Sequence, residues 1–159
     1  MKSIKVAFFA VLFILLGMAR YSQAQSFHLV KATCQRWAGG VAGHYGVNYY
    51  IELETSSPAI IPDTVWVDGK TYPINFTSKS GNELRKIDSV THKITYSIWA
   101  RESHMEVNPM MKGAGSDTAA SGKPARSFEG AALVSYRLKH KQHFFTVKSF
   151  TQLPQLNYP

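Results

Sequence analysis

The alternation of apolar and polar residues with a period of two is the feature that most limits what this chain can fold into. It is clearest in residues 93–101, which read "KITYSIWAR", and it recurs in residues 49–54. Successive side chains of a strand point to opposite faces, so this period predicts half-buried β-strands. After the first 24 residues only 81–87, "GNELRKI", are expected to form one or two helical turns.

Seven segments share this pattern and are rich in β-branched and aromatic residues, as strands are. They are residues 27–37, 47–55, 64–67, 70–77, 93–101, 130–138 and 142–150. Asp68-Gly69 predicts a two-residue hairpin turn, and Pro73 predicts that the strand after it lies at an edge or carries a bulge. The pattern indicates an all-β fold, namely a single immunoglobulin-like antiparallel β-sandwich of about seven strands.

The first residues indicate a cleaved secretory signal peptide. Lys2 and Lys5 precede an uncharged apolar run from Val6 to Ala19, and the small residues Ser22 and Ala24 predict cleavage after Ala24. The run is shorter than the roughly 20 residues of a membrane span, although a retained anchor is the alternative. We therefore expect a signal peptide over residues 1–24 and an exported domain over 25–159, periplasmic or extracellular, with no transmembrane segment after cleavage.

Size and charge narrow the class of partner. Cleavage of the 159-residue chain leaves 135 residues, enough for one compact domain, and lowers the net charge from +8 to +5 because Lys2, Lys5 and Arg20 are removed. This excess of positive charge favours an envelope protein or an acidic glycan as partner. Nucleic acid is disfavoured, because the positive charge is not gathered into one stripe. The lone cysteine, Cys34, excludes an internal disulfide and is expected to pack as a small hydrophobe.

A long connection is expected at 102–129, where residues 113–125 have the composition of a flexible linker. Such a loop serves either as a binding loop or as a mobile connection. It contains four residues whose side chains suit copper(I), which are His104, Met105, Met110 and Met111. A periplasmic copper-binding protein is therefore one alternative function. Continued strand alternation instead predicts that Met105 faces inward and His104 outward.

The glycine-rich segment "WAGGVAGHYG" (37–46) predicts a connection between the first two strands. Aromatic rings around it would provide a surface for a sugar or a peptide, and we take as candidate ligand-binding residues Trp37, His44, Tyr45 and Tyr50. The alternative is a turn that needs positive φ, with the rings covering one end of the sandwich.

No catalytic motif stands out. The sequence lacks a nucleophile elbow, a paired-histidine zinc helix and a glycine-rich phosphate loop, and the carboxylates of Glu52 and Glu54 fit a solvent-facing strand side. The sequence thus favours an exported, non-enzymatic binding or envelope-associated protein with no cofactor and no catalytic residues. A cryptic hydrolase is the second alternative.

Three stretches, "SQAQ", "GGVAGHYGVNY" and "FFTVKSFTQLPQLNYP", resemble small exported β-sandwich proteins of Bacteroidota, a family without an assigned activity. The resemblance covers most of the chain after residue 24 and implies export, with no catalytic residue. It also implies O-glycosylation at Asp followed by Ser or Thr and a small apolar residue. Three triplets fit and are expected to lie in loops, giving Thr64, Ser89 and Thr118 as candidate sites. Ordinary turn and strand-start chemistry is the alternative for these triplets.

Overall fold

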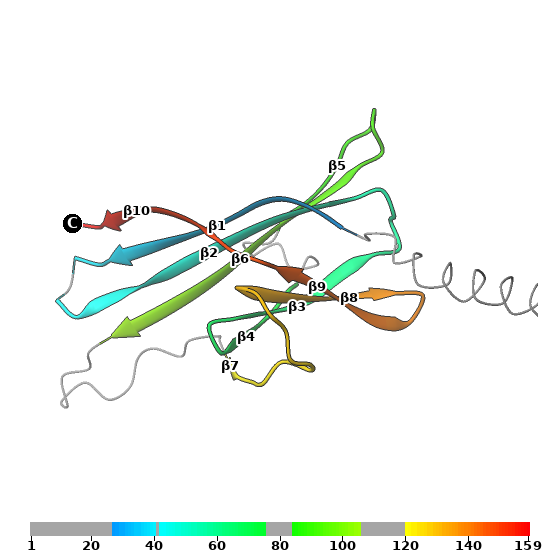
Figure 1. Ribbon diagram of the computed structural model, residues 1–159. Coiled ribbons are helices and arrows are strands. Elements are labelled where there is room, and N and C mark those ends of the chain that lie inside the picture. The colour runs from blue at the N-terminus through cyan, green and yellow to red at the C-terminus, as the bar shows by residue number, and fades with distance from the viewer. Residues whose placement is uncertain (1–26, 41, 76–83, 106–119) are drawn as a thin grey trace, which may run out of the picture.

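The protein is all-β. The computed structural model describes residues 27–40, 42–75, 84–105 and 120–159, and within these residues it has ten strands and no helix (Figure 1). The strands are β1 (His28–Ala38), β2 (His44–Thr55), β3 (Ile61–Val67), β4 (Lys70–Pro73), β5 (Leu84–Ile87), β6 (Ile94–Met105), β7 (Ala120–Ser121), β8 (Ala132–Leu138), β9 (Lys141–Val147) and β10 (Thr151–Asn157). Across these ranges, no helix is long and apolar enough to cross a membrane.

The strands form two five-stranded sheets. Sheet A has the order β10-β1-β2-β6-β5, and sheet B has the order β7-β4-β3-β8-β9. All neighbours pair antiparallel except β1 and β10, which run parallel from the pair Thr33 and Thr151 to the pair Ala38 and Asn157. The two sheets lie over one another as layers (Figure 1).

The core lies between the sheets and follows from the alternation in the sequence. Every second residue of β2 and β6 faces sheet B, and β3, β4, β8 and β9 supply the opposing side chains. The buried apolar residues of this core include Tyr49, Ile51, Leu53, Val65, Val67, Ile94, Tyr96, Ile98, Ala132, Val134 and Val147. Phe27 closes one end, with its ring edge-on to Tyr96 and Tyr136.

The predicted hairpin turn is confirmed. Val67 pairs with Lys70, and Asp68 and Gly69 between them have φ of 51° and 72°, as a type I′ turn requires. Lys139 and His140 form a second two-residue turn of the same kind between β8 and β9, with φ of 49° and 65°.

The sequence-based strand assignment needs several corrections. There are ten described strands rather than about seven, and the sandwich is not purely antiparallel. Residues 84–87 form β5 instead of helical turns, and the segment expected as one strand over 142–150 ends at Val147. The chain then starts β10, which the sequence did not reveal because its residues are mostly polar and include Pro154. Tertiary pairing rather than local propensity creates both β5 and β10.

The predicted long loop begins later than expected. β6 continues through Met105, so residues 102–105 belong to a strand. His104 lies on the same face of β6 as the core residues Ile98 and Ala100, because the register with β2 is unbroken. His104 therefore lies on the other strand face from the one expected, but its side chain is 47% exposed, as expected for a residue that faces water, because β6 extends past sheet B.

The sandwich has two ends. We call one of them the C-terminal end. It holds the connection from β1 to β2, the turn Asp68-Gly69 and the last residues of β6 and β10 (left in Figure 1). The end called the hairpin end holds the last residues of β2, the β5–β6 turn and the β8–β9 turn.

Candidate functional site

A cavity of about 440 Å³ opens at the C-terminal end, within the size range of small-molecule sites. Its lining comes from β1, β2, β6, β10 and the β3–β4 turn, and comprises Arg36, Trp37, Ala38, Tyr45, Gly46, Val47, Asp68, Glu102, His104 and Gln155. Strand length explains its position. β2 and β6 have 12 residues each, whereas β3 and β8 have 7, so the long strands of sheet A extend past sheet B.

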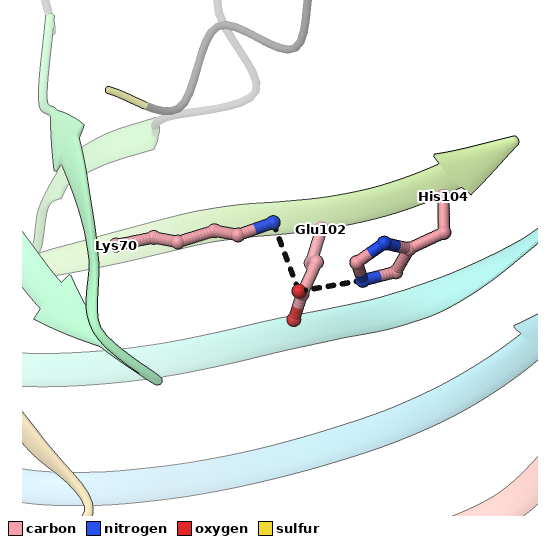
Figure 2. A network of polar contacts seen from close by, with 3 residues as sticks. All are labelled: Lys70, Glu102 and His104. Carbon is pink, nitrogen blue, oxygen red and sulfur yellow. Dashed lines mark hydrogen bonds and ion pairs between the residues drawn. The ribbon is translucent and has the colours of Figure 1, made fainter. Parts of the chain in front are cut away.

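Glu102 is the central polar group of this cavity. It follows Ile98 and Ala100 on the inward face of β6, and its side chain is only 8% exposed. The Lys70 ammonium lies 2.9 Å from Oε1, and His104 Nε2 lies 2.7 Å from the same atom (Figure 2). Lys70 begins β4 directly after the Asp68-Gly69 turn, so the tight turn places a cation of sheet B against a carboxylate of sheet A.

The Glu102 carboxylate is held in its charged form. Burial raises its pKa, but hydrogen bonds and charge attraction from Lys70 and His104 outweigh burial and leave the pKa below its ordinary value. Near neutral pH the group is therefore a hydrogen-bond acceptor rather than a proton donor.

An aromatic wall stands beside this carboxylate. The Tyr45 ring stacks on the His104 imidazole at 5.4 Å between centroids and 26° between planes, and Tyr45 is 47% exposed. Tyr49 lies deeper in the core. Burial is the main cause that raises its pKa well above the ordinary value, and the charges of Asp68 and Glu102 add to the effect. Tyr49 therefore keeps its phenolic proton.

The charges in and beside the cavity cancel. Arg36 and Lys70 are cationic, and Asp68 and Glu102 are anionic. A cavity with this balance presents donors and acceptors without a strong net field, which suits an uncharged polar ligand better than an ion.

Two of the four predicted ligand-binding residues meet on the outer face of sheet A. The Trp37 ring is buried, with the His44 ring edge-on at 4.9 Å and the Arg101 guanidinium 4.3 Å from its centroid. His44 Nε2 lies 3.1 Å from Ser103 Oγ. Among the described residues, Trp37 Nε1 has no hydrogen-bond partner. Trp37 is thus a packed residue, and its ring is not offered to solvent.

The other two predicted residues separate. Tyr45 belongs to the cavity, whereas Tyr50 lies on the outer face with its ring 4.5 Å from that of Trp99. Tyr50 donates a hydrogen bond to Glu52 at 2.8 Å, and Glu54 pairs with Lys93 at 3.2 Å. The carboxylates of Glu52 and Glu54 therefore already have partners on the outer face.

No sequence pattern predicted the main polar residues of the cavity. They are Arg36, Asp68, Glu102 and Gln155, and Lys70 is paired with Glu102 beside them. For Glu102 a signal was available, because a carboxylate occupies a position in β6 where the alternation calls for an apolar residue. The others come from a strand end, a turn and β10, where no local pattern predicts their meeting.

The geometry of the described residues gives no support to the copper hypothesis. His104 is engaged by Glu102 and Tyr45, and Met105 pairs with His44 in the backbone register of β6 and β2. Met110 and Met111 lie outside the described residues. Within the described ranges, no group of three or more His, Cys, Asp or Glu residues is placed to hold a metal ion.

The three candidate glycosylation sites differ in setting. Thr64 lies half-buried within β3 rather than in a loop, and the carboxylate of the preceding Asp63 accepts a hydrogen bond from Ser135. Ser89 lies in the exposed β5–β6 turn, as expected. Thr118 lies outside the described residues. Cys34, which is half-buried, packs against the core as predicted.

Comparison with models of protein families, with curated proteins and with solved structures gave no match for this chain. The site is therefore interpreted from its own geometry.

Proposed function

We propose that this protein is an exported, non-enzymatic binding protein whose cavity at the C-terminal end takes a carbohydrate. The observation that carries the proposal is the half-exposed Tyr45 ring beside the ionised Glu102. A sugar offers an apolar C–H face to an aromatic ring and hydroxyl donors to a carboxylate, so the two groups match the two sides of one ligand.

The rest of the cavity supports an uncharged ligand. Gln155 supplies an amide with both donors and acceptors, and Arg36 and Asp68 supply a charged donor and a charged acceptor. Lys70 and His104 are already engaged by Glu102, which leaves little cationic capacity for a phosphate or sulfate.

The test is binding of the purified protein to a panel of neutral and acidic oligosaccharides by isothermal titration calorimetry. Tyr45→Ala is expected to weaken binding about tenfold, because it removes the stacking surface. Trp99→Ala is the matched control, since it removes a similarly exposed ring from the opposite face of sheet A. Equal losses in both variants, or no binding by the unaltered protein, would refute the carbohydrate site.

A hydrolase is the second candidate, because the carboxylates of Asp68 and Glu102 line one cavity. It predicts that an oligosaccharide is cleaved during incubation, and that Asp68→Asn abolishes cleavage while the sugar still binds. An intact oligosaccharide recovered after prolonged incubation would exclude it.

The copper alternative stays a prediction. It is tested by measuring whether copper(I) raises the melting temperature and whether His104→Ala with Met110→Ala removes that rise.

We also propose an immunoglobulin-like identity for the sandwich. Immunoglobulin domains order their strands A-B-E-D in one sheet and C-F-G in the other. With β1, β2, β6 and β5 as A, B, E and D, and β3, β8 and β9 as C, F and G, the observed order agrees. β4 corresponds to the added C′ strand of variable-type domains, and β7 and β10 are additions.

Export and modification are tested together by the intact mass of the protein from its native cells. Cleavage after Ala24 predicts the mass of residues 25–159, and glycosylation adds to it in increments of sugar residues. A mass equal to the full chain would contradict export through a cleaved signal, and an unmodified mass would contradict glycosylation at Thr64, Ser89 and Thr118.

A further inference from the structure

The β5–β6 hairpin presents apolar side chains to solvent at the end opposite the cavity. Val90 at its tip is 85% exposed, and Leu84 and Ile87 in β5 are 60% and 58% exposed. Leu84 pairs with Ser97 and Ile87 with Ile94, so the two apolar side chains lie on opposite faces of the hairpin. In Figure 1 the hairpin projects from the body of the sandwich.

Cations accompany these apolar residues. Arg85 and Lys86 alternate in β5, so each face of the hairpin carries one apolar and one basic side chain. The β8–β9 turn lies at the same end of the sandwich in the other sheet and adds Lys139 and Lys141, both exposed.

The described carboxylates of this end are already engaged. Glu54 pairs with Lys93 at 3.2 Å, and Asp63 with Arg137 at 3.4 Å. Asp88 Oδ1 accepts hydrogen bonds from the backbone N–H groups of Val90 and Thr91. Among the residues that the structure describes, no salt bridge is formed by Arg85, Lys86, Lys139 or Lys141, and Lys86 acts on the Asp88 carboxylate only through charge attraction.

We propose that the hairpin end docks on an anionic lipid bilayer, with Val90 at the level of the headgroups and the basic residues on the lipid phosphates. A convex tip with apolar residues on both faces fits a deformable interface that can surround it, and basic residues next to apolar ones are the pattern of surface-bound membrane proteins. The hydrogen bonds of Asp88 fix the turn that carries Val90. In this orientation the cavity at the C-terminal end faces away from the membrane.

Vesicle flotation with protein isolated from its native cells tests this proposal. The vesicles are phosphatidylcholine alone and phosphatidylcholine with phosphatidylglycerol. Binding to the anionic vesicles should exceed binding to the neutral ones. Binding to the neutral vesicles is the control, because it measures any contribution of the apolar run Val6–Ala19. Lys86→Gln with Lys139→Gln should weaken the binding about twentyfold, since each cation near an anionic surface contributes about fivefold.

Two further variants sharpen the test. Lys123→Gln with Lys148→Gln removes the same charge from exposed positions near the C-terminal end and should leave binding unchanged. Val90→Ser should weaken binding about threefold, because the tip loses its apolar contact. Equal binding to both vesicle types, or equal losses in the two double variants, would overturn the proposal. Binding to soluble polyaspartate but not to vesicles would overturn it in favour of an acidic protein partner.

Discussion

At the scale of single residues, Glu102 shows how one side chain both joins the sheets and prepares a site. It occupies a position where the alternation of β6 calls for an apolar residue, and it can be buried there because the Lys70 ammonium and the His104 imidazole, from different strands, both reach it. A buried carboxylate is tolerated only when it is paired and hydrogen-bonded. Its environment therefore makes Glu102 a stability determinant as well as a group that lines the cavity.

Replacing Glu102 with Gln is expected to lower the free energy of unfolding at pH 7 by about 1 kcal/mol, because Lys70 and His104 lose a charged partner. The folded state depresses the pKa of Glu102, so the stabilisation is present above the ordinary value of 4.5 and is lost as the pH falls through the lowered pKa. Urea unfolding of both proteins between pH 7 and pH 2.5 measures this difference. Glu54→Gln, which breaks the more exposed pair with Lys93, is the control and should change stability by a few tenths of a kcal/mol. A difference between wild type and Glu102→Gln that stays constant with pH would contradict the assignment.

At Gly46 the backbone of β6 and the Trp37 ring leave no room for a side chain. A Cβ there would clash with the backbone oxygen of Glu102 and would come within 2.7 Å of the Trp37 ring. Gly46→Ala is therefore expected to destabilise the protein by about 3 kcal/mol, measured by thermal unfolding. Gly69→Ala is the comparison, because a Cβ at Gly69 meets open space and only its φ of 72° opposes the change; about 1 kcal/mol is expected. Similar losses in both variants would show that crowding at Gly46 is relieved by backbone movement.

At the scale of the elements, the β5–β6 hairpin is held by its turn more than by packing. All four β5 residues are exposed, and the turn depends on Asp88, whose N–H donates to the Lys93 carbonyl and whose carboxylate accepts from Val90 and Thr91. The backbone hydrogen bonds from Val90 and Thr91 lower the pKa of Asp88. The carboxylate therefore stays ionised, and keeps these hydrogen bonds, in mildly acidic solution.

Asp88→Ala should therefore speed amide hydrogen exchange at Val90 and Thr91 while the melting temperature stays unchanged, because the hairpin opens locally. Asp88→Asn retains an acceptor oxygen and should keep most of the protection. Exchange rates followed by NMR give both readings. Unchanged protection in Asp88→Ala would mean that pairing with β6 alone fixes the turn.

The sequence predicted elements well where a local signal matched the tertiary structure. The hairpin at Asp68-Gly69 was predictable because positive φ at two adjacent residues has its own sequence signature. β10 was not, because a parallel edge strand with a proline is specified by its partner β1 and by contacts such as that of Phe150 with Tyr49. Alternation continued from Ile98 also places Glu102 and His104 on the inward face of β6, and the unbroken register of β2 and β6 confirms that phase.

At the scale of the whole molecule, the two proposed surfaces occupy opposite ends of the sandwich. β6 starts at the hairpin end and finishes at the cavity, and its 12 residues span about 40 Å at roughly 3.3 Å per residue. The candidate site itself could not be assembled from the sequence, because its residues meet only when the Asp68-Gly69 turn, β6 and β10 converge. Of the predicted aromatic group, only Tyr45 and the buried Trp37 line it.

This separation predicts that the two proposed activities, oligosaccharide binding and membrane docking, are independent. Tyr45→Ala should leave vesicle binding unchanged, and Lys86→Gln with Lys139→Gln should leave oligosaccharide affinity unchanged, because distant sites without shared contacts behave additively. Calorimetry on the vesicle-bound protein gives the direct measurement. A change in sugar affinity on vesicle binding of more than about twofold would indicate that the ends are coupled.

The parallel pairing of β1 with β10 also sets the order in which the chain can mature. Gln35 donates a hydrogen bond to the carbonyl of Pro154, 119 residues away, and Gln155 closes one side of the cavity. One edge of β1 therefore stays open until β10 has been synthesised. Closing so long a loop is slow compared with forming the local hairpins, so the binding cavity is among the last parts of the protein to form. A cell that makes this protein must shield the open edge of β1 until β10 pairs with it.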